Sequence, residues 1–217
     1  QTLTHQLKGP LSAIRGAAEL LREDLPDMDR KRFISNIDTE SDRLLRIVER
    51  MLELSAIEQQ KELRNVETID LSQLVKDIID EMAVPLKRKE IILLLQVGKG
   101  FCFKGERFLI QQAVINLLNN AVEFTPQGGT ISVEINEHWN RLFLIIRDSG
   151  PGIPDYALDK VFDKFYSLQR PDTGKKSSGL GLSLVKEVAN LHRGTITLKN
   201  SNPPGTGAVA VLKLPIG

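Results

Sequence analysis

The chain has 217 residues, of which 41% are hydrophobic and 26% are charged, the proportions of one large or two small globular domains. Lysine and arginine (29) nearly balance aspartate and glutamate (28), which excludes the strongly basic surface of a nonspecific nucleic-acid binder. The single cysteine, Cys102, excludes an intramolecular disulfide framework and a multi-cysteine zinc site. We expect no signal peptide in these residues, and the longest apolar run, 91–95, is far shorter than the ~20 residues of a membrane-spanning helix.

Residues 1–60 have the pattern of two helices joined by a short turn at 24–27. Because Gln1 lies within the helical pattern, we expect a fragment of a longer protein. Two helices enclose only one seam, so we expect a dimer that forms a four-helix bundle; the alternative is packing against the rest of the same chain. The predicted apolar stripes are Leu3, Leu7, Leu11, Ile14, Ala18 and Leu21, and then Phe33, Ile37, Leu44, Val48 and Met51.

Beyond a polar linker at 61–65 the pattern changes, and 66–217 mixes strands with helices. Asp70 or Ser72 is the expected N-cap of a helix that continues to about Lys89. Together the segments predict an α+β sandwich with helices on one face of a sheet. Strands are expected at 66–70, 91–97, 101–103, 130–136, 141–148, 195–200 and 207–214, and further helices at 107–123 and 179–192.

Two asparagines and a turn are the first candidates for chemistry. Asn116 and Asn120 are four residues apart, so their amides share one helix face, where their oxygens could bind Mg²⁺ or could simply be solvated. Asp148 follows a strand and precedes Gly150 and Gly152. Its carboxylate could accept a hydrogen bond from an exocyclic amine such as that of adenine, but the same residues also make ordinary turns.

A loop and a histidine complete the set. Residues 174–182 run from a loop into a helix, where exposed amides and the lysines Lys175 and Lys176 would attract phosphate. The polar stretch 167–178 is typical of a mobile lid over a ligand, or of a plain surface loop. His5 is directed away from the apolar stripe and can act as a nucleophile, whereas His138 and His192 are interpreted as surface residues.

In order and spacing these motifs resemble the catalytic core of a sensor histidine kinase of a two-component system. His5 with Pro10 resembles the H box of that family, and 116–126 resembles the N box. Residues 148–154, 162–165 and 179–182 resemble the first glycine box, the F box and the second glycine box. The stretches 14–21 and 152–158 are most similar to the carbon-source-responsive CreC-type kinases.

The resemblance implies a dimerisation and histidine-phosphotransfer hairpin at 1–60 and an ATP-binding domain of the gyrase and Hsp90 type at 66–217. It implies a homodimer, a response regulator as partner, and no contact with nucleic acid or membrane by this cytoplasmic fragment of an inner-membrane-anchored sensor. ATP would phosphorylate His5, with Mg²⁺ held by Asn116 and Asn120 and the adenine amine held by Asp148. The other residues implied around the nucleotide are Gly150, Gly152, Phe165, Gly179, Leu180, Gly181 and Leu182.

Three departures from the family pattern bear on activity. Gln6 stands where the family usually has the acidic residue that takes the imidazole proton. Gly9 stands where a side chain linked to phosphatase activity is common. Glu123 and Phe124 replace the common Lys-Tyr pair of the N box, so that Arg170, Lys175 or Lys176 would have to supply the missing phosphate-binding cation.

Two alternatives remain at this point. A nucleotide-binding dimer scaffold with impaired kinase activity is compatible with Gln6. An ATP hydrolase of the same superfamily is disfavoured, because Asn116 occupies the position at which such enzymes carry the glutamate that activates water.

Overall fold

The computed structural model describes residues 3–172, 174, 177–201 and 206–216, and at His5 it describes the backbone only. The chain divides into two compact units, Gln1–Ala56 and Ile57–Gly217. The first contains a helical hairpin and the second contains both sheets of the molecule.

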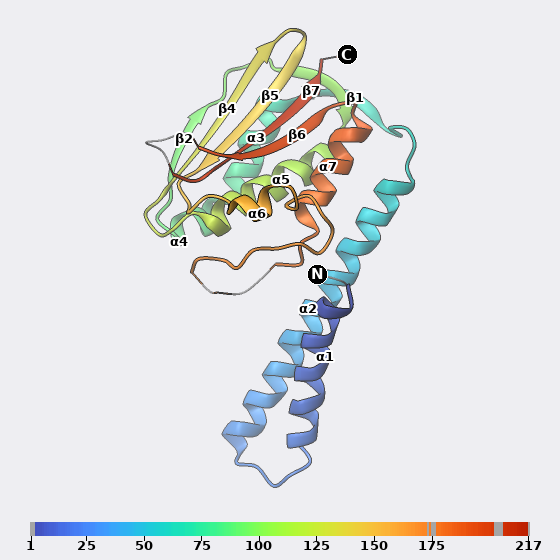
Figure 1. The fold of residues 1–217 in the computed structure, drawn as a ribbon, viewed down its shortest axis with the longest axis vertical. Coiled ribbons are helices and arrows are strands. Elements are labelled where there is room, and N and C mark those ends of the chain that lie inside the picture. The colour runs from blue at the N-terminus through green and yellow to red at the C-terminus, as the bar shows by residue number, and fades with distance from the viewer. Residues whose placement is uncertain (1–2, 173, 175–176, 202–205, 217) are drawn as a thin grey trace. The chain divides into compact units, whose positions relative to one another are not determined.

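The hairpin consists of α1 (Leu3–Leu20) and α2 (Asp27–Gln59), which run antiparallel (Figure 1). Its buried face differs in part from the predicted stripes, because Leu11 and Val48 are 54% and 44% exposed while Ala17 and Ile47 are buried. A pair of helices has one seam, so apolar residues beyond it stay on the surface. The exposed apolar side chains of the hairpin are Leu11, Leu20, Met28, Ile34, Leu45, Val48 and Leu52.

The second unit is built on a five-stranded mixed sheet. Its strand order is β2 (Ile92–Gln96), β4 (Thr130–His138), β5 (Arg141–Asp148), β7 (Ala208–Pro215) and β6 (Thr195–Asn200). The β2 strand runs parallel to β4, and the other neighbours are antiparallel. A separate two-stranded sheet pairs β1 (Val66–Asp70) with β3 (Cys102–Glu106).

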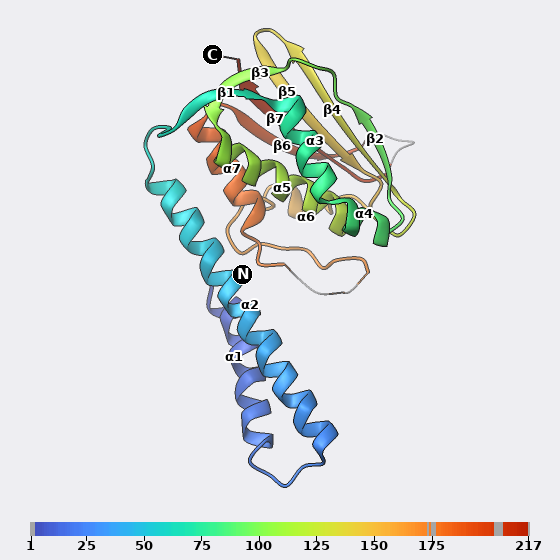
Figure 2. The same ribbon diagram turned by 180° about the vertical axis from the view of Figure 1, so that it is seen from behind.

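Three helices, α3 (Leu71–Glu81), α5 (Arg107–Phe124) and α7 (Gly181–Leu191), cover one face of the five-stranded sheet (Figures 1 and 2). Alternate residues of the central strands point into this layer, as period-two burial along a half-covered sheet requires. The predicted α+β sandwich is therefore confirmed. The fully buried side chains of the core include Leu71, Leu74, Ile78, Ile110, Ile131, Leu142, Leu144, Leu212 and Leu214.

Proline breaks the helix that the sequence pattern extends to Lys89. Asp70 caps it, accepting a hydrogen bond from the Gln73 amide (3.1 Å), but α3 ends at Glu81. A proline ring clashes with the carbonyl group four residues earlier, which for Pro85 belongs to Glu81. The chain restarts as the short helix α4 (Ala83–Arg88), in which Pro85 lies in the first turn. A four-residue helix, α6 (Asp155–Leu158), was not predicted.

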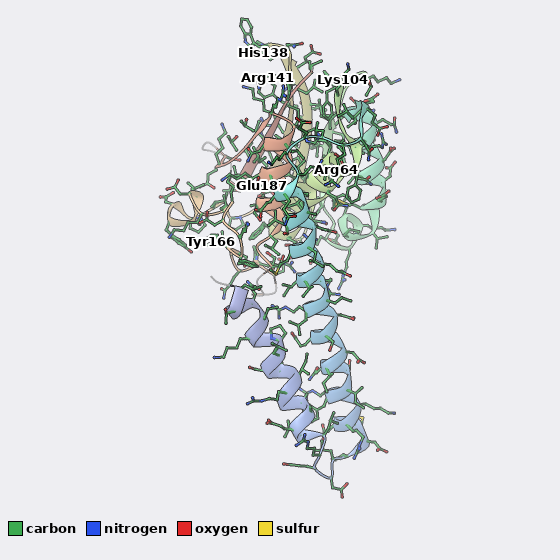
Figure 3. The ribbon with its side chains drawn as sticks, turned by 90° about the vertical axis from the view of Figure 1, so that its right-hand side faces the viewer. Arg64, Lys104, His138, Arg141, Tyr166 and Glu187 are labelled. Atoms are coloured by element: carbon green, nitrogen blue, oxygen red, sulfur yellow. The ribbon has the colours of Figure 1, made fainter. Side chains whose placement is uncertain are left out.

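The β4–β5 connection is a two-residue turn. Its central residues, Trp139 and Asn140, both have positive φ (51° and 56°), as a type I′ hairpin turn requires. Trp139 is 84% exposed at the tip and lies edge-on to the ring of His138. Figure 3 shows His138 and Arg141 at one end of this unit and Tyr166 at the other.

The prediction that His192 is a surface residue is wrong, because only 4% of it is exposed. Its Nδ1 lies 2.8 Å from the Val188 carbonyl oxygen, and its Nε2 accepts a hydrogen bond from the Glu106 amide (3.0 Å). These two bonds define a neutral ring with the proton on Nδ1. Burial lowers the pKa of His192 below its ordinary 6.5, and the imidazole joins the end of α7 to the start of α5.

Candidate functional site

A cavity of the second unit lies between the C-terminal half of α5, the end of β5 and the chain leading into α7. It encloses about 880 Å³ of empty space, including the part that is open to solvent. Its walls are mostly apolar, and the apolar side chains that line it include Leu117, Phe124, Ile146, Ile153, Val161, Leu168, Leu182 and Leu198.

Asp148 is the one carboxylate among the described residues that line the cavity. Its Oδ1 accepts hydrogen bonds from the amides of Gly150 (2.9 Å) and Ala208 (3.1 Å). Burial raises the pKa of the Asp148 carboxyl, and the two backbone bonds oppose that shift. A carboxylate held in this way in an apolar pocket can accept a hydrogen bond from a ligand amine.

The turn after Asp148 is held at both ends by side chains. Ser149 Oγ accepts a hydrogen bond from the Thr130 amide (2.8 Å), and Asn200 bonds to both the amide (2.7 Å) and the carbonyl oxygen (2.8 Å) of Ile153. Gly150 packs so closely on α5 that a Cβ atom there would lie 2.6 Å from the Phe124 carbonyl oxygen. The turn is therefore fixed against both α5 and β6.

The chain enters α7 through a second glycine turn. Gly179 has a φ of 66°, and a Cβ atom there would lie 2.6 Å from backbone atoms of Phe165 and Tyr166. The Phe165 amide donates to the Gly179 carbonyl oxygen (2.9 Å), which closes the base of the intervening loop. No side chain caps α7, whose first residue, Gly181, lines the cavity. Amides of an uncapped first turn are suited to bind anions.

Only one of the two asparagines of the N box lines the cavity. Asn120 lines the cavity, whereas Asn116 is buried, lies outside the lining and donates from Nδ2 to the Gln112 carbonyl oxygen (2.8 Å). The described residues hold no cluster of three or more His, Cys, Asp or Glu side chains that could bind a metal. A cation here would rely on amide oxygens together with phosphate and water, a donor set that suits Mg²⁺.

The remaining candidates fall into three groups. Phe124, Gly152, Gly179, Gly181 and Leu182 line the cavity, whereas Glu123, Gly150, Phe165, Arg170 and Leu180 do not. Leu180 is part of the core, and Arg170 is ion-paired with Glu123. Lys175 and Lys176 lie outside the described residues.

In the hairpin, His5 is a helical position of α1 whose side chain lies outside the described part of the chain. Gln6 is buried, with 9% exposed. The predicted outward direction of the imidazole therefore stays a prediction.

Of the apolar lining, the sequence candidates included only Phe124 and Leu182, and they did not include the two anchoring residues, Asn200 and Lys89. The alternation of buried and exposed residues along β5 predicts that Ile146 is buried, but it does not indicate that Ile146 lines a cavity. Asn200 bonds to a residue 47 positions away in the sequence, and Lys89 bonds to residues at least 33 positions away. Contacts over such separations cannot be predicted from a local sequence pattern.

A mixed sheet backed by three helices, with a cavity at two glycine turns and a helical hairpin carrying an N-terminal histidine, defines the catalytic core of a histidine kinase. Two family comparisons agree. Residues 1–60 match the "His Kinase A (phospho-acceptor) domain", and residues 105–217 match the "Histidine kinase-, DNA gyrase B-, and HSP90-like ATPase" family. The chain belongs to the histidine kinase family.

Among curated proteins, the chain is 41% identical over 203 residues to the sensor protein CreC of Escherichia coli (strain K12), an alignment that covers 94% of the chain and 42% of CreC. It is 28% identical over 215 residues to the sensor-like histidine kinase SenX3 of Mycolicibacterium smegmatis, covering 98% of the chain and 56% of SenX3. The chain thus spans about half the length of these relatives. None of the helices in its described part has the length and apolar character needed to cross a bilayer.

Solved structures show the same fold. Histidine kinase ThkA in complex with response regulator protein TrrA matches with a TM-score of 0.79 and 24% identity, over 99% of this chain and 60% of that one. The histidine kinase AdeS of Acinetobacter baumannii matches with a TM-score of 0.73 and 22% identity, over the whole length of both chains.

Proposed function

We propose that this chain binds ATP in the cavity at Asp148, transfers the γ-phosphoryl group to His5 and then passes it to an aspartate of a response regulator. The carrying observation is the half-buried Asp148 carboxylate, held by two backbone amides in an apolar pocket that also contains Asn120 and the uncapped start of α7. An adenine ring fits apolar walls with one acceptor for its amine, and the uncapped amides suit its phosphates.

The roles of the residues follow from their positions. Asp148 would accept the adenine amine, and Gly179 and Gly181 would let the backbone approach the phosphates. Asn120 would hold Mg²⁺ through its amide oxygen, whereas Asn116, one turn earlier on α5, lies outside the cavity lining. Bound magnesium would neutralise negative charge on the phosphates during transfer.

His5 would supply the nucleophile. A neutral imidazole nitrogen would form a P–N bond to the γ-phosphorus while the bond from that phosphorus to the ADP oxygen breaks. The imidazole proton must leave, and the Gln6 side chain cannot accept it at neutral pH. Positioning and charge neutralisation would therefore supply most of the catalysis.

Two partners are part of this proposal. The exposed side chains Ile34, Leu45, Val48 and Leu52 lie on one stripe of α2, where a second copy of the hairpin would bury them in a four-helix bundle. The similar kinase ThkA was solved in complex with the response regulator TrrA, which supports a receiver domain as the acceptor of the phosphoryl group.

Incubation with γ-labelled ATP and Mg²⁺ tests the function. We expect label that stays on the protein, is lost in acid and is absent from the His5→Ala variant, because phosphoramidates are acid-labile. Addition of a receiver domain should then remove the label from the chain. Acid-stable label, or undiminished label in His5→Ala, would contradict phosphorylation of His5.

A nucleotide-binding scaffold with impaired kinase activity is the second candidate, favoured by the buried Gln6. Under this alternative the chain binds ATP but acquires no label. We expect Gln6→Glu to raise the initial rate of labelling, by about tenfold or more if general-base catalysis has its usual size. An unchanged rate would show that the residue after His5 does not limit the reaction.

A further inference from the structure

Two ion pairs connect the loop before α7 to the C-terminal end of α5. Arg170 donates from Nε to Glu123 Oε2 (3.0 Å) and from Nη2 to Oε1 (2.5 Å), a two-pronged pair. Lys89 Nζ lies 2.5 Å from Asp172 Oδ2. Both loop residues are therefore held by α5 or by a residue packed on it.

Lys89 is itself fixed in place. Its ammonium donates to the carbonyl oxygens of Val122 (2.8 Å) and Thr125 (2.8 Å), with a longer bond to that of Glu123 (3.3 Å). These carbonyls belong to the last turn of α5 and to its C-cap residue, where backbone acceptors have no partner within the helix. The cation that meets Asp172 is thus anchored by α5, which distinguishes it from a mobile surface lysine.

The four side chains are shielded enough for the pairs to matter. Their exposed fractions are 22% for Lys89, 29% for Glu123, 32% for Arg170 and 39% for Asp172. Exposed ion pairs contribute little, but a two-pronged pair of arginine and carboxylate combines charge with defined geometry.

The loop so anchored also forms a wall of the cavity. Ser167 and Leu168 line the cavity just before Arg170, and Ser167 Oγ donates to the Ser177 carbonyl oxygen (3.1 Å) across the loop. The Gly174 amide donates to the Arg170 carbonyl oxygen (2.9 Å), which closes a turn. A shift of Arg170 would therefore also displace Leu168, which lies two residues earlier in the chain and forms part of the cavity wall.

We propose, on the basis of the proposed function, that Glu123 and Lys89 are positioning residues that hold the Ser167–Leu168 wall of the nucleotide cavity through Arg170 and Asp172. None of these four charged residues lines the cavity. Because Glu123 neutralises Arg170, Arg170 supports the wall and does not serve as the phosphate-binding cation, a role for which the sequence left Arg170, Lys175 and Lys176 as candidates. Glu123, which replaces the lysine common at this position of the N box, therefore has a structural role in holding Arg170.

The test compares binding of ATP with binding of adenosine, each measured by displacement of a fluorescent ATP analogue from the full chain. A displaced wall should lower the affinities for ATP and for adenosine by the same factor, because the wall does not contact phosphate selectively. We expect Glu123→Gln and Arg170→Gln each to lower both affinities by about fivefold. The double variant should bind neither ligand more weakly than the single variants do. Asp172→Asn should act in the same direction.

Exchange of the charges and a matched control complete the experiment. The variant with Glu123→Arg and Arg170→Glu should recover most of the affinity, whereas a merely damaged fold would not. Glu134→Gln removes a similar ion pair, with Arg147, on the sheet outside the cavity and should leave both affinities unchanged. Thermal unfolding of each variant monitors the fold.

Three results would overturn the inference. Loss of ATP binding but not of adenosine binding in Arg170→Gln would make Arg170 a direct phosphate ligand. Additive effects of the two single variants would show that the residues act separately. If the unmodified chain binds ATP but no variant differs from it, this inference fails alone; if the unmodified chain binds no ATP, the proposed function fails with it.

Discussion

At the scale of single residues, Asp148 shows how a binding site costs stability. Its carboxylate is held among apolar side chains, and burial raises the pKa of Asp148 because the charged form loses hydration. Two backbone amides offset only part of this cost. The folded state therefore favours the protonated acid, and above the pKa of the unfolded chain the ionised form destabilises the fold.

Asp148→Asn should stabilise the fold and weaken nucleotide binding. An asparagine retains the Oδ1 acceptor for Gly150 and Ala208 but replaces the second oxygen by an NH₂ donor, which cannot accept the adenine amine. We expect the free energy of unfolding at pH 7 to rise by about 1 kcal/mol and ATP affinity to fall by about tenfold or more. Chemical denaturation and nucleotide titration measure the two effects.

The exposed Asp159→Asn provides the control and should change neither quantity. A less stable Asp148→Asn variant would show that the carboxylate is better compensated than its burial indicates. In the unmodified chain, ATP affinity should decrease as the pH falls through the raised pKa of Asp148, because protonation removes the acceptor.

Residue patterns in the sequence predicted the polar half of the site better than the apolar half. Asp148, Gly152, Gly179 and Gly181 lie in turns or at the ends of elements beside them, where a few neighbouring residues determine the backbone, and all four line the cavity. The pairing of Glu123 with Arg170 depends on chain segments 47 residues apart. Such contacts follow from tertiary packing, so local patterns do not contain them.

At the scale of secondary-structure elements, length and periodicity decided what could be predicted. Helix α5 and strands β4 and β5 have enough turns or alternations to be recognised, and their bounds agree closely with the prediction. The helix α6 has four residues and is too short to show a period. The parallel pairing of β2 with β4 and the pairing of β1 with β3 join distant segments and needed the structure.

His192 makes the junction of α7 and α5 sensitive to pH. The folded state lowers the pKa of His192 below 6.5, so below that pH the unfolded chain binds a proton that the folded chain resists. This histidine's contribution to stability is present above 6.5 and is lost as the pH falls. We expect the free energy of unfolding to decrease by at most about 1.4 kcal/mol for each pH unit below 6.5.

Chemical denaturation between pH 8 and pH 5.5 measures the slope of the free energy of unfolding against pH. In His192→Gln the slope should become smaller, since the titrating group is removed while an acceptor for the Glu106 amide remains. The exposed His138→Gln should keep the slope of the unmodified chain. An unchanged slope in His192→Gln would assign the pH dependence to other groups.

At the scale of the whole molecule, the hairpin has more apolar surface than its own seam can bury. Ile34, Leu45, Val48 and Leu52 repeat at helical spacing and are 44–66% exposed. Leu45, Val48 and Leu52 follow one another on this stripe, and exposed apolar side chains grouped in this way mark an interaction site. Its position on the hairpin that matches the His Kinase A (phospho-acceptor) domain agrees with the proposed second copy as the occupant.

Leu45→Glu should therefore weaken the dimer, because it places a charge in the proposed helix–helix seam. We expect the dissociation constant to rise by about tenfold or more, as for a central apolar interface residue. Sedimentation velocity over a concentration series measures it. Arg46→Gln changes the neighbouring exposed residue and should leave the dimer intact; a monomeric unmodified chain would contradict the proposed assembly.

The β4–β5 turn has a consequence for optical measurements. Trp139 is the single tryptophan of the chain and is exposed at the tip of that turn. Figure 3 shows the flanking residues His138 and Arg141 at the end of the unit opposite to Tyr166, which lines the cavity. The indole emission of Trp139 will consequently be red-shifted and insensitive to ligands, so it serves as an internal concentration standard. A dye attached to the nucleotide is the suitable reporter of occupancy.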